Sequence, residues 1–517
     1  MRHIRRSISA LAVCLLFAAS SLFAQDLASF EKRTTLKKLD NGLTLIVMER
    51  PEAPVFSYAT VVNVGSAREV PGITGLAHMF EHMAFKGSEN VGSTDYPEER
   101  QALQKVEEAY AAYDAERRKE TGSDEAKVAQ LEQAWKGAIA TANKYVVPEE
   151  FSRIVDRAGA VGVNAFTASD ETVFFYSLPS NRVELWAYME SERFLHPVFR
   201  EFYKERDVVF EERRMRTESS PFGRVIQEFL AAAFIAHPYG FPTVGWPSDL
   251  KSFSATDAAN FFHKYYVPSN MVIAVVGDVK TAEVMPLLEK YFGRLPKAPA
   301  PEPLRTVEPE QRAERTVVLH EKSQPIYLEG YHRPSATSPD DPVYDVIEML
   351  LSSGRTSRLY RSLVRDKKIA AQAQGFNGFP GSKYPSLFTF LAITTPGHTP
   401  ADVTAAIAQE LDRLKNEDVS PEELASVKAR VKAGLLRQLD SNSGLALQLA
   451  ETQTVYGDWR ELFRSVDKID KVTAADIRRV ANATFNINNR TIAYVDNSPA
   501  KTASVATPAA APKGDSK

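Results

Sequence analysis

The sequence contains almost no cysteine. Of its 517 residues, only Cys14 carries a thiol, and it lies in an apolar run near the N-terminus. The rest of the chain therefore cannot form disulfides and offers neither a thiol nucleophile nor a thiolate metal ligand. Any metal ion held by that part of the protein must be bound by histidine, aspartate or glutamate.

The sequence also lacks an excess of charge of either sign. Lysine and arginine total 63, aspartate and glutamate total 66, and the net charge is −3. A basic excess is typical of nucleic-acid binding, so the composition gives no support for that function. A hydrophobic content of 44% and a charged content of 25% are typical of a globular protein. At 517 residues the chain exceeds one ordinary core, so two or more large lobes are expected.

Long apolar runs are missing except at the N-terminus. Three arginines precede a mainly apolar stretch at residues 8–23, and small or polar residues follow it. This pattern predicts a secretory signal peptide over residues 1–24, cleaved after Ala24. An uncleaved membrane anchor is the alternative, but the run is short for a span of about 20 residues and is interrupted by serines. We therefore expect a periplasmic protein without a stable membrane span after cleavage.

Histidine is scarce, yet two of the nine histidines stand four positions apart in His78-Met79-Phe80-Glu81-His82. On a helix, residues four apart share one face, so His78 and His82 can point at one site with Glu81 beside them. Thr74 is the predicted N-cap of this helix. Two imidazoles suit zinc, and a nearby carboxylate can take a proton from zinc-bound water. This order is the inverted form of the common zinc-peptidase motif. The alternative is a pair of structural histidines at helical spacing.

A segment of different composition follows this motif. Residues 97–146 are rich in Glu, Lys, Gln and Ala, with a break at residues 121–124. The pattern predicts an antiparallel helical hairpin, residues 97–120 and 124–146, inserted into the first domain. Its charges are expected to form a solvated face, and a lid or partner contact is the alternative role.

The chain contains an internal repeat. Ser254 and Thr473 each open a predicted helix that leads to a buried strand at Asn270 and Asn489, and 219 positions separate both pairs. The sequence therefore predicts an α+β fold of two homologous halves, each a mainly antiparallel sheet packed with helices. The predicted domains are an N-terminal metallopeptidase domain at residues 27–295, a proline-rich linker at 296–313, a C-terminal domain without the metal motif at 314–497, and a disordered tail at 498–517.

A catalytic zinc site needs a third protein ligand. Glu205 and Glu212 are seven positions apart, so they would share a helix face two turns apart. One of them could bind the metal while the other holds a ligand histidine from behind. Spacing alone leaves their roles open, because an acidic helix is often only solvated.

Several motifs in order resemble the pitrilysin and mitochondrial processing peptidase family, over about residues 34–496. The resemblance implies that zinc is bound by His78, His82 and Glu212, and that Glu205 supports the catalytic site. It also implies that Asn164 and Ala165 bind substrate as a sheet edge to which an extended peptide adds. The motifs are residues 78–87, Asn164-Ala165-Phe166-Thr167, Glu205 to Glu212, His237-Pro238-Tyr239-Gly240 with Gly245-Trp246, and Ser357-Arg358-Leu359-Tyr360.

Two departures from the family pattern matter. The separation of 130 positions from His82 to Glu212 exceeds the gap in compact members, and the inserted hairpin accounts for the excess. Active single-chain relatives carry an arginine and a tyrosine in the second half, and the tyrosine stabilises the developing oxyanion. Here Arg365 remains, but Ala371 stands where the tyrosine is expected. The resemblance thus implies the metal-bearing subunit of a heterodimer whose homologous partner supplies the arginine and tyrosine, with a homodimer as the alternative.

Together these features predict a zinc metalloendopeptidase subunit that hydrolyses unfolded peptides enclosed between two lobes. Glu81 is the expected general base on zinc-bound water. Without the tyrosine, Arg358 and Arg365 are expected to pair with acidic residues rather than contact substrate. The alternative function is a non-catalytic scaffold subunit of a peptidase-like complex.

Overall fold

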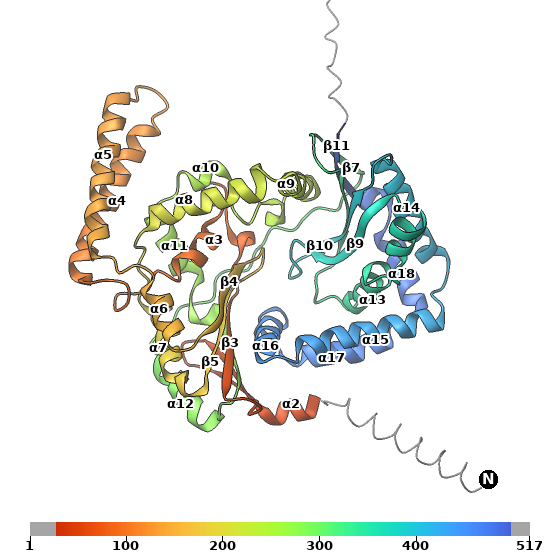
Figure 1. Ribbon diagram of the computed structural model, residues 1–517, viewed down its shortest axis with the longest axis horizontal. Coiled ribbons are helices and arrows are strands. Elements are labelled where there is room, and N and C mark those ends of the chain that lie inside the picture. Colours follow the sequence, from red (N-terminus) through yellow and green to blue (C-terminus); the bar gives the residue numbers. More distant parts are fainter. Residues whose placement is uncertain (1–26, 498–517) are drawn as a thin grey trace, which may run out of the picture.

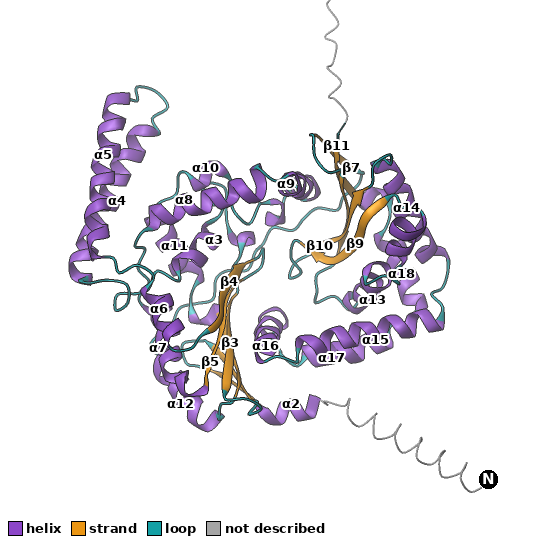
Figure 2. Cartoon of the chain, viewed as in Figure 1, coloured by secondary structure: helices purple, strands orange, loops and turns teal. Residues whose placement is uncertain are grey.

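A computed structural model describes residues 27–497, and the predicted signal peptide and C-terminal tail lie outside the described residues. The described chain forms two β-sheets, each with helices against it, on the two sides of the molecule (Figure 1, Figure 2). No helix in this part of the chain combines the length and apolar character needed to cross a membrane.

The first sheet has six strands in the order β1-β2-β6-β3-β5-β4. β2 and β6 pair in parallel, and the other neighbours are antiparallel. β6 is buried along its whole length, as expected for a central strand covered on both faces. The strands are β1 (Thr34–Lys38), β2 (Thr44–Glu49), β3 (Val55–Val62), β4 (Val161–Thr167), β5 (Thr172–Pro179) and β6 (Met271–Gly277).

The second sheet repeats the arrangement of the first without a counterpart of β1. Its order is β7-β11-β8-β10-β9, with β7 and β11 parallel and the other neighbours antiparallel. This confirms the predicted fold class, two mainly antiparallel sheets packed with helices in related halves. The strands are β7 (Arg315–His320), β8 (Ile326–Arg333), β9 (Ala370–Phe379), β10 (Ser386–Thr394) and β11 (Arg490–Asp496).

The 219-residue repeat corresponds to one structural unit. α11 (Ala255–Tyr265) leads into β6, and α18 (Ala474–Thr484) leads into β11. Each helix begins with a capping box, made by Ser254 with Asp257 and by Thr473 with Asp476. Other helices of the two halves are α2 (Leu27–Arg33), α6 (Glu150–Arg157), α7 (Val183–Leu195), α10 (Pro247–Leu250), α12 (Thr281–Phe292), α13 (Asp341–Ser352), α14 (Pro400–Asn416), α15 (Pro421–Gln438) and α17 (Glu461–Lys471).

The inserted segment is an antiparallel helix pair, α4 (Tyr96–Arg117) and α5 (Glu125–Ala142), at the outer side of the first half (Figure 1). A buried ion pair between Glu99 and Arg200 anchors its base, with Arg200 Nε 2.9 Å from Glu99 Oε1. Arg200 also donates to the carbonyl oxygens of Lys86, Ser88 and Val91. The insertion is therefore attached to the loop that follows the histidine motif.

Each half contributes a helix that covers the sheet of the other half. α9 (Pro221–Ala233) packs its apolar side chains against β8, β10 and β11 of the second sheet. α16 (Asn442–Tyr456) packs in the same way against β2, β3 and β6 of the first sheet (Figure 1). Because burial of apolar surface drives this packing, the two halves are expected to stabilise one another.

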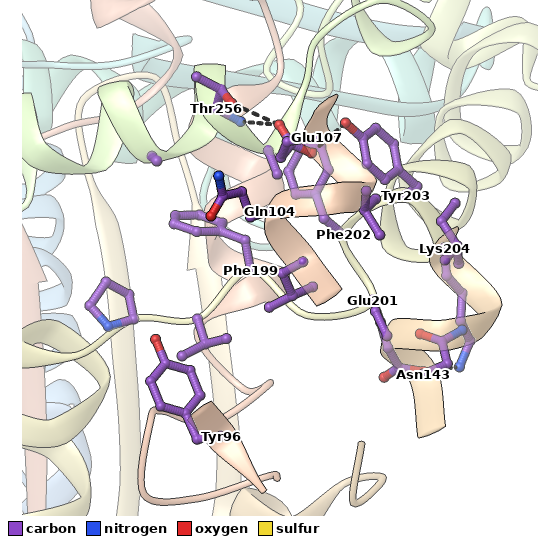
Figure 3. A pocket seen from close by; sticks show the side chains of 18 residues that line it. Tyr96, Gln104, Glu107, Asn143, Phe199, Glu201, Phe202, Tyr203, Lys204 and Thr256 are labelled. Atoms are coloured by element: carbon purple, nitrogen blue, oxygen red, sulfur yellow. Dashed lines mark hydrogen bonds and ion pairs between the residues drawn. The ribbon is translucent and has the colours of Figure 1, made fainter. Parts of the chain in front are cut away.

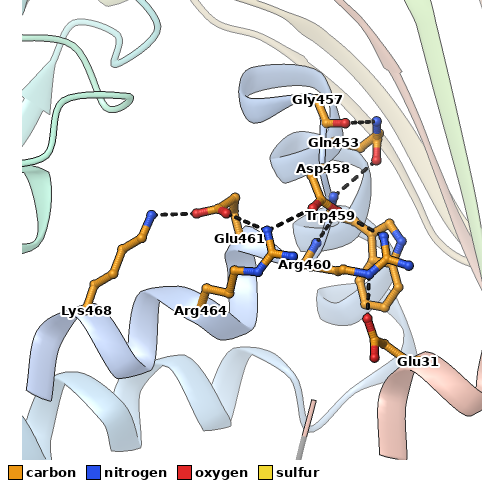
Figure 4. A network of polar contacts seen from close by, with 9 residues as sticks. All are labelled: Glu31, Gln453, Gly457, Asp458, Trp459, Arg460, Glu461, Arg464 and Lys468. Atoms are coloured by element: carbon orange, nitrogen blue, oxygen red, sulfur yellow. Dashed lines mark hydrogen bonds and ion pairs between the residues drawn. The ribbon is translucent and has the colours of Figure 1, made fainter. Parts of the chain in front are cut away.

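Polar contacts reinforce this junction at two places. Around the α16–α17 turn, Glu31 of α2 accepts a hydrogen bond from Arg460, which also pairs with Asp458 (Figure 4). At the β4–β5 turn, Asp170 accepts a hydrogen bond from the Tyr239 hydroxyl at 2.6 Å and two more from the backbone of residues 382 and 383.

A carboxyl pair, Glu171 and Glu451, lies between the β4–β5 turn and α16. Burial raises the pKa of Glu171 to about 8, with the neighbouring charges of Glu451 and Asp170 adding to the effect. Burial likewise raises the pKa of Glu451 to about 7. At pH values between the ordinary pKa of 4.5 and these raised pKa values, the two carboxyl groups hold protons in the folded state that they have released in the unfolded state. The stability that this pair contributes at low pH is therefore lost as the pH rises toward 8.

We expect Glu451→Gln to reduce this pH dependence, because a neutral amide needs no proton to remain buried. The comparison is between the metal-free variant and the metal-free original chain. Their difference in free energy of unfolding should shift in favour of the variant, by on the order of 1 kcal/mol, between about pH 5 and about pH 8. Thermal unfolding at both pH values measures the difference, with exposed Glu422→Gln as control. An unchanged pH dependence in Glu451→Gln would show that the pair does not act in this way.

Candidate metal centre

Two helices from distant parts of the first half bring three candidate ligands together. α3 (Leu76–Met83) carries His78 and His82, and α8 (Phe202–Arg213) carries Glu212. The Glu212 carboxylate lies 3.6 Å from His78 Nε2 and 3.4 Å from His82 Nε2. One ligand atom from each residue lies within 4.8 Å of the others, and no further group of this kind occurs among residues 27–497. His78, His82 and Glu212 form this metal group, and they are the three residues that the family resemblance assigned to zinc.

The geometry of the metal group fits a zinc ion. Tetrahedral zinc with bonds of about 2.0–2.1 Å places its ligand atoms about 3.3 Å apart. The Glu212 carboxylate lies 3.6 Å and 3.4 Å from the two imidazole nitrogens, close to this spacing. The donor set is two imidazole nitrogens and one carboxylate oxygen, which zinc accepts readily. Burial and then neighbouring His82 lower the pKa of His78 to about 4, so this imidazole is neutral and ready to bind a metal.

Glu205 lies behind His82, where a carboxylate could orient the imidazole ring. Its Oε2 atom is 3.5 Å from His82 Nδ1, on the side of the ring away from Glu212, and its Oε1 atom pairs with Lys86 at 2.5 Å. Burial acts to lower the pKa of His82, but Glu205 and Glu212 outweigh it and raise the pKa to about 9. A carboxylate in this position fixes the ring orientation and increases its basicity as a ligand.

Glu81 reaches from α3 to Thr167 on β4. Its Oε2 atom accepts a hydrogen bond of 2.7 Å from the hydroxyl of Thr167. Burial raises the pKa of Glu81 above its ordinary value, although the Thr167 hydrogen bond opposes this change. A carboxylate with a raised pKa, close to a metal group, is suited to take up and release a proton.

Asn164 and Ala165 lie on β4, the edge strand of the first sheet opposite β1. Both residues line a cavity of about 390 Å³ together with Glu81, His82 and Glu205. Within the described chain, β4 pairs with β5 on one side only, so its other edge has backbone groups available for a further strand. The structure thus places the predicted substrate strand beside the predicted metal ligands.

The predicted N-cap of α3 is wrong. The cap position is Gly75, with φ of 96°, and Thr74 instead donates its hydroxyl hydrogen to Asp249 at 2.6 Å. Glu69 satisfies the helix start by accepting hydrogen bonds of 2.7 Å from the backbone N–H groups of Gly75 and Ala77. Local capping patterns extend over about three residues, so they could not reveal a carboxylate six and eight positions upstream.

The second-half arginines pair with carboxylates, as expected. Arg358 lies 2.7 Å from Glu423, and Arg365 lies 2.6 Å from Asp366. Ala371 lies exposed on β9, the edge strand of the second sheet opposite β7. β9 occupies the same place in its sheet as β4 does in the first.

A second cavity lies beneath the inserted hairpin, between α4, α5, α8 and α11 (Figure 3). Its volume is about 270 Å³, its walls are mainly apolar, and it shares no lining residue with the metal group. Glu107 in its wall already accepts hydrogen bonds from Thr256 and the Tyr203 hydroxyl. This cavity is separate from the candidate chemistry.

We expect Glu212→Gln to lose most of its zinc affinity, by about 100-fold or more, because a neutral amide replaces a charged ligand. Its neighbour Glu211 is exposed and pairs with Arg214, which makes Glu211→Gln a matched control that should bind zinc normally. Competition with a chelator measures both affinities. Equal zinc binding by the two variants would remove Glu212 from the ligand set.

The chain matches known proteins over most of its length. Residues 45–116 match the family described as Insulinase (Peptidase family M16), and residues 252–431 match the Peptidase M16 inactive domain. The chain is 28% identical over 507 residues to the zinc protease PqqE of Helicobacter pylori, covering 96% of this chain and 100% of that protein.

Solved structures agree with these matches. The crystal structure of a protease from Helicobacter pylori has a TM-score of 0.75 and 26% identity, covering 90% of this chain and 99% of that chain. The periplasmic protease PqqL from Escherichia coli shares the fold at 16% identity and a TM-score of 0.65. The match covers 90% of this chain and 48% of that chain. The chain therefore belongs to peptidase family M16, the pitrilysin and insulinase family, with zinc protease homologues over most of its length.

Proposed function

We propose that this chain is a zinc-dependent endopeptidase that hydrolyses unfolded peptides between its two halves. The observation that carries the proposal is the convergence of His78, His82 and Glu212, with Glu81 beside them and a free strand edge along the same cavity. Its similarity to a zinc protease over nearly the whole chain supports the same reaction.

The metal group, Glu81 and Glu205 have separate roles in the proposed reaction. When bound by His78, His82 and Glu212, a zinc ion would acidify water and polarise a peptide carbonyl. Glu81 takes a proton from the attacking water and returns it to the leaving amine, while its hydrogen bond to Thr167 holds the carboxylate in place. Glu205 orients the His82 ring from behind.

The substrate class follows from the position of β4. A peptide must be extended to add to a sheet edge, because its backbone N–H and C=O groups then pair along the strand. A folded segment would hide those groups in its own hydrogen bonds. We therefore assign unfolded or extended peptides as substrates, with Asn164 and Ala165 lining the path beside Glu81.

Replacing Glu81 with glutamine should abolish peptide cleavage, because the amide cannot accept the proton of water. Zinc affinity should stay within about twofold, since Glu81 is outside the metal group. Glu149 lines the same cavity without the Thr167 hydrogen bond, so Glu149→Gln is the control and should stay active. Cleavage of an unstructured peptide by Glu81→Gln at the normal rate would disprove the role of Glu81.

We further propose that the chain is the metal-bearing subunit of a heterodimer in the periplasm. The support is Ala371, which replaces the expected tyrosine, and the signal-like segment at residues 1–24. A homologous partner would supply the arginine and tyrosine that complete the site, and a homodimer is the alternative.

The isolated chain should accordingly cleave peptides weakly, and a homologous partner that carries the tyrosine should restore activity. Ala371 lies exposed on an outer strand, so Ala371→Tyr can be tested without crowding a core. Peptide cleavage with and without the co-purified partner measures the effect. Strong cleavage by the isolated chain would contradict the need for a partner.

A non-catalytic scaffold subunit is the second candidate, favoured by the match of residues 252–431 to the family described as inactive. The intact metal group argues against it, because a scaffold has no need of these ligands. A purified chain that is free of zinc and does not cleave peptide, even with its partner, would favour the scaffold.

A further inference from the structure

The metal-binding helix α3 is short and has no cap of its own. It has eight residues, two of which are ligands and a third the proposed base. Its cap residue, Gly75, has a positive φ and no side chain to accept from the first turn. The backbone N–H groups at a helix start need acceptors, and a buried start without them is costly. Some other group must therefore hold this helix in place.

Glu69 is that group. The side chain is buried, and its two oxygens accept separate hydrogen bonds from the N–H groups of Gly75 and Ala77, each at 2.7 Å. Ala77 is the residue directly before His78. Burial raises the pKa of Glu69 to about 8, and the two backbone hydrogen bonds, which favour the carboxylate, oppose this rise only in part. Two acceptor oxygens are required, which a carboxylate provides and an amide does not.

The loop between Glu69 and α3 is fixed by a second carboxylate. Asp249 Oδ2 accepts from the N–H groups of Gly72 and Thr74, at 3.0 and 3.1 Å, and from the Thr74 hydroxyl. Thr74 Oγ1 in turn accepts from the backbone N–H of Trp246 at 2.9 Å. The loop before α3 is thus attached to the segment 245–249. This segment begins with the Gly245-Trp246 motif of the family resemblance, which the proposed chemistry does not use.

The same segment also contacts α8. Arg213, next to the ligand Glu212, donates to the carbonyl oxygen of Gly245 at 2.6 Å. A Cβ atom on Gly245 would lie 2.3 Å from the Thr74 carbonyl oxygen, and Gly245 has φ of 81°, so glycine permits this close approach. Residues 245–249 therefore connect the start of α3 with the ligand-bearing end of α8.

We propose that Glu69 is a positioning residue that holds α3 where His78 and His82 meet Glu212, with residues 245–249 bracing the two helices against each other. The proposal rests on the zinc site of the proposed function. Metal sites tolerate displacements of only about 0.2 Å in their bond lengths. A small shift of α3 therefore weakens the metal group without unfolding the domain.

The test is the zinc affinity of Glu69→Gln, measured by chelator competition on the full chain. The variant loses one of the two acceptor oxygens, and we expect about 10- to 100-fold weaker zinc binding. The matched control is Glu329→Gln in the second half, where a fully buried carboxylate accepts from the hydroxyls of Tyr327 and Tyr331. The control should lower the thermal midpoint of the metal-free protein but leave zinc affinity within about twofold.

A spectroscopic measurement separates positioning from general stability. The visible absorption of bound Co²⁺ reports ligand geometry, so it should change in Glu69→Gln and stay unchanged in Glu329→Gln. If Glu69→Gln does not fold, Asp249→Asn, which weakens the same loop, should show the same loss to a smaller degree. Normal zinc affinity in the folded variants, or equal weakening in the control, would overturn the positioning role alone. Absence of zinc binding by the unsubstituted chain would overturn this role and the proposed function together.

Discussion

The structure depends on bringing three metal-binding atoms to within 4.8 Å of one another from distant parts of the chain. Glu212 follows His82 by 130 residues, yet its carboxylate lies 3.4 Å from the His82 ring. No local interaction can produce this contact. It requires the helices α3 and α8 to be fixed separately, and the buried carboxylates of Glu69 and Asp249 and the guanidinium of Arg213 provide the contacts that do so.

The two halves are related in structure but differ in chemistry. Both contain the same five-strand arrangement and the same capped helix leading into a buried strand, 219 residues apart. Only the first half carries a metal group among the described residues. The exchange of α9 and α16 between the sheets joins the halves into one molecule, so the half without ligands stabilises the half that has them. The exposed edges of β4 and β9 are equivalent in the two sheets, and only β4 adjoins the metal group.

Much of this could be predicted from the sequence, because the informative patterns are local. The i, i+4 histidines and the two capping boxes each lie within a few residues. The choice of Glu212 over Glu205 needed the family resemblance, since helical spacing treats them alike. The N-cap prediction at Thr74 failed because Glu69 reaches α3 from outside the local motif. The exchange of α9 and α16 between sheets was not predicted, because an apolar helix face does not specify which sheet it will cover.

The central claim is that this chain holds one zinc ion through two imidazoles and one carboxylate. X-ray absorption at the zinc edge, on the purified full chain with its metal content measured, tests this most directly. We predict one zinc per chain, a shell of nitrogen and oxygen at about 2.0–2.1 Å, the outer scattering of two imidazole rings, and no sulfur shell. A chain that retains no zinc, or a zinc ion whose spectrum lacks imidazole scattering, would contradict the account.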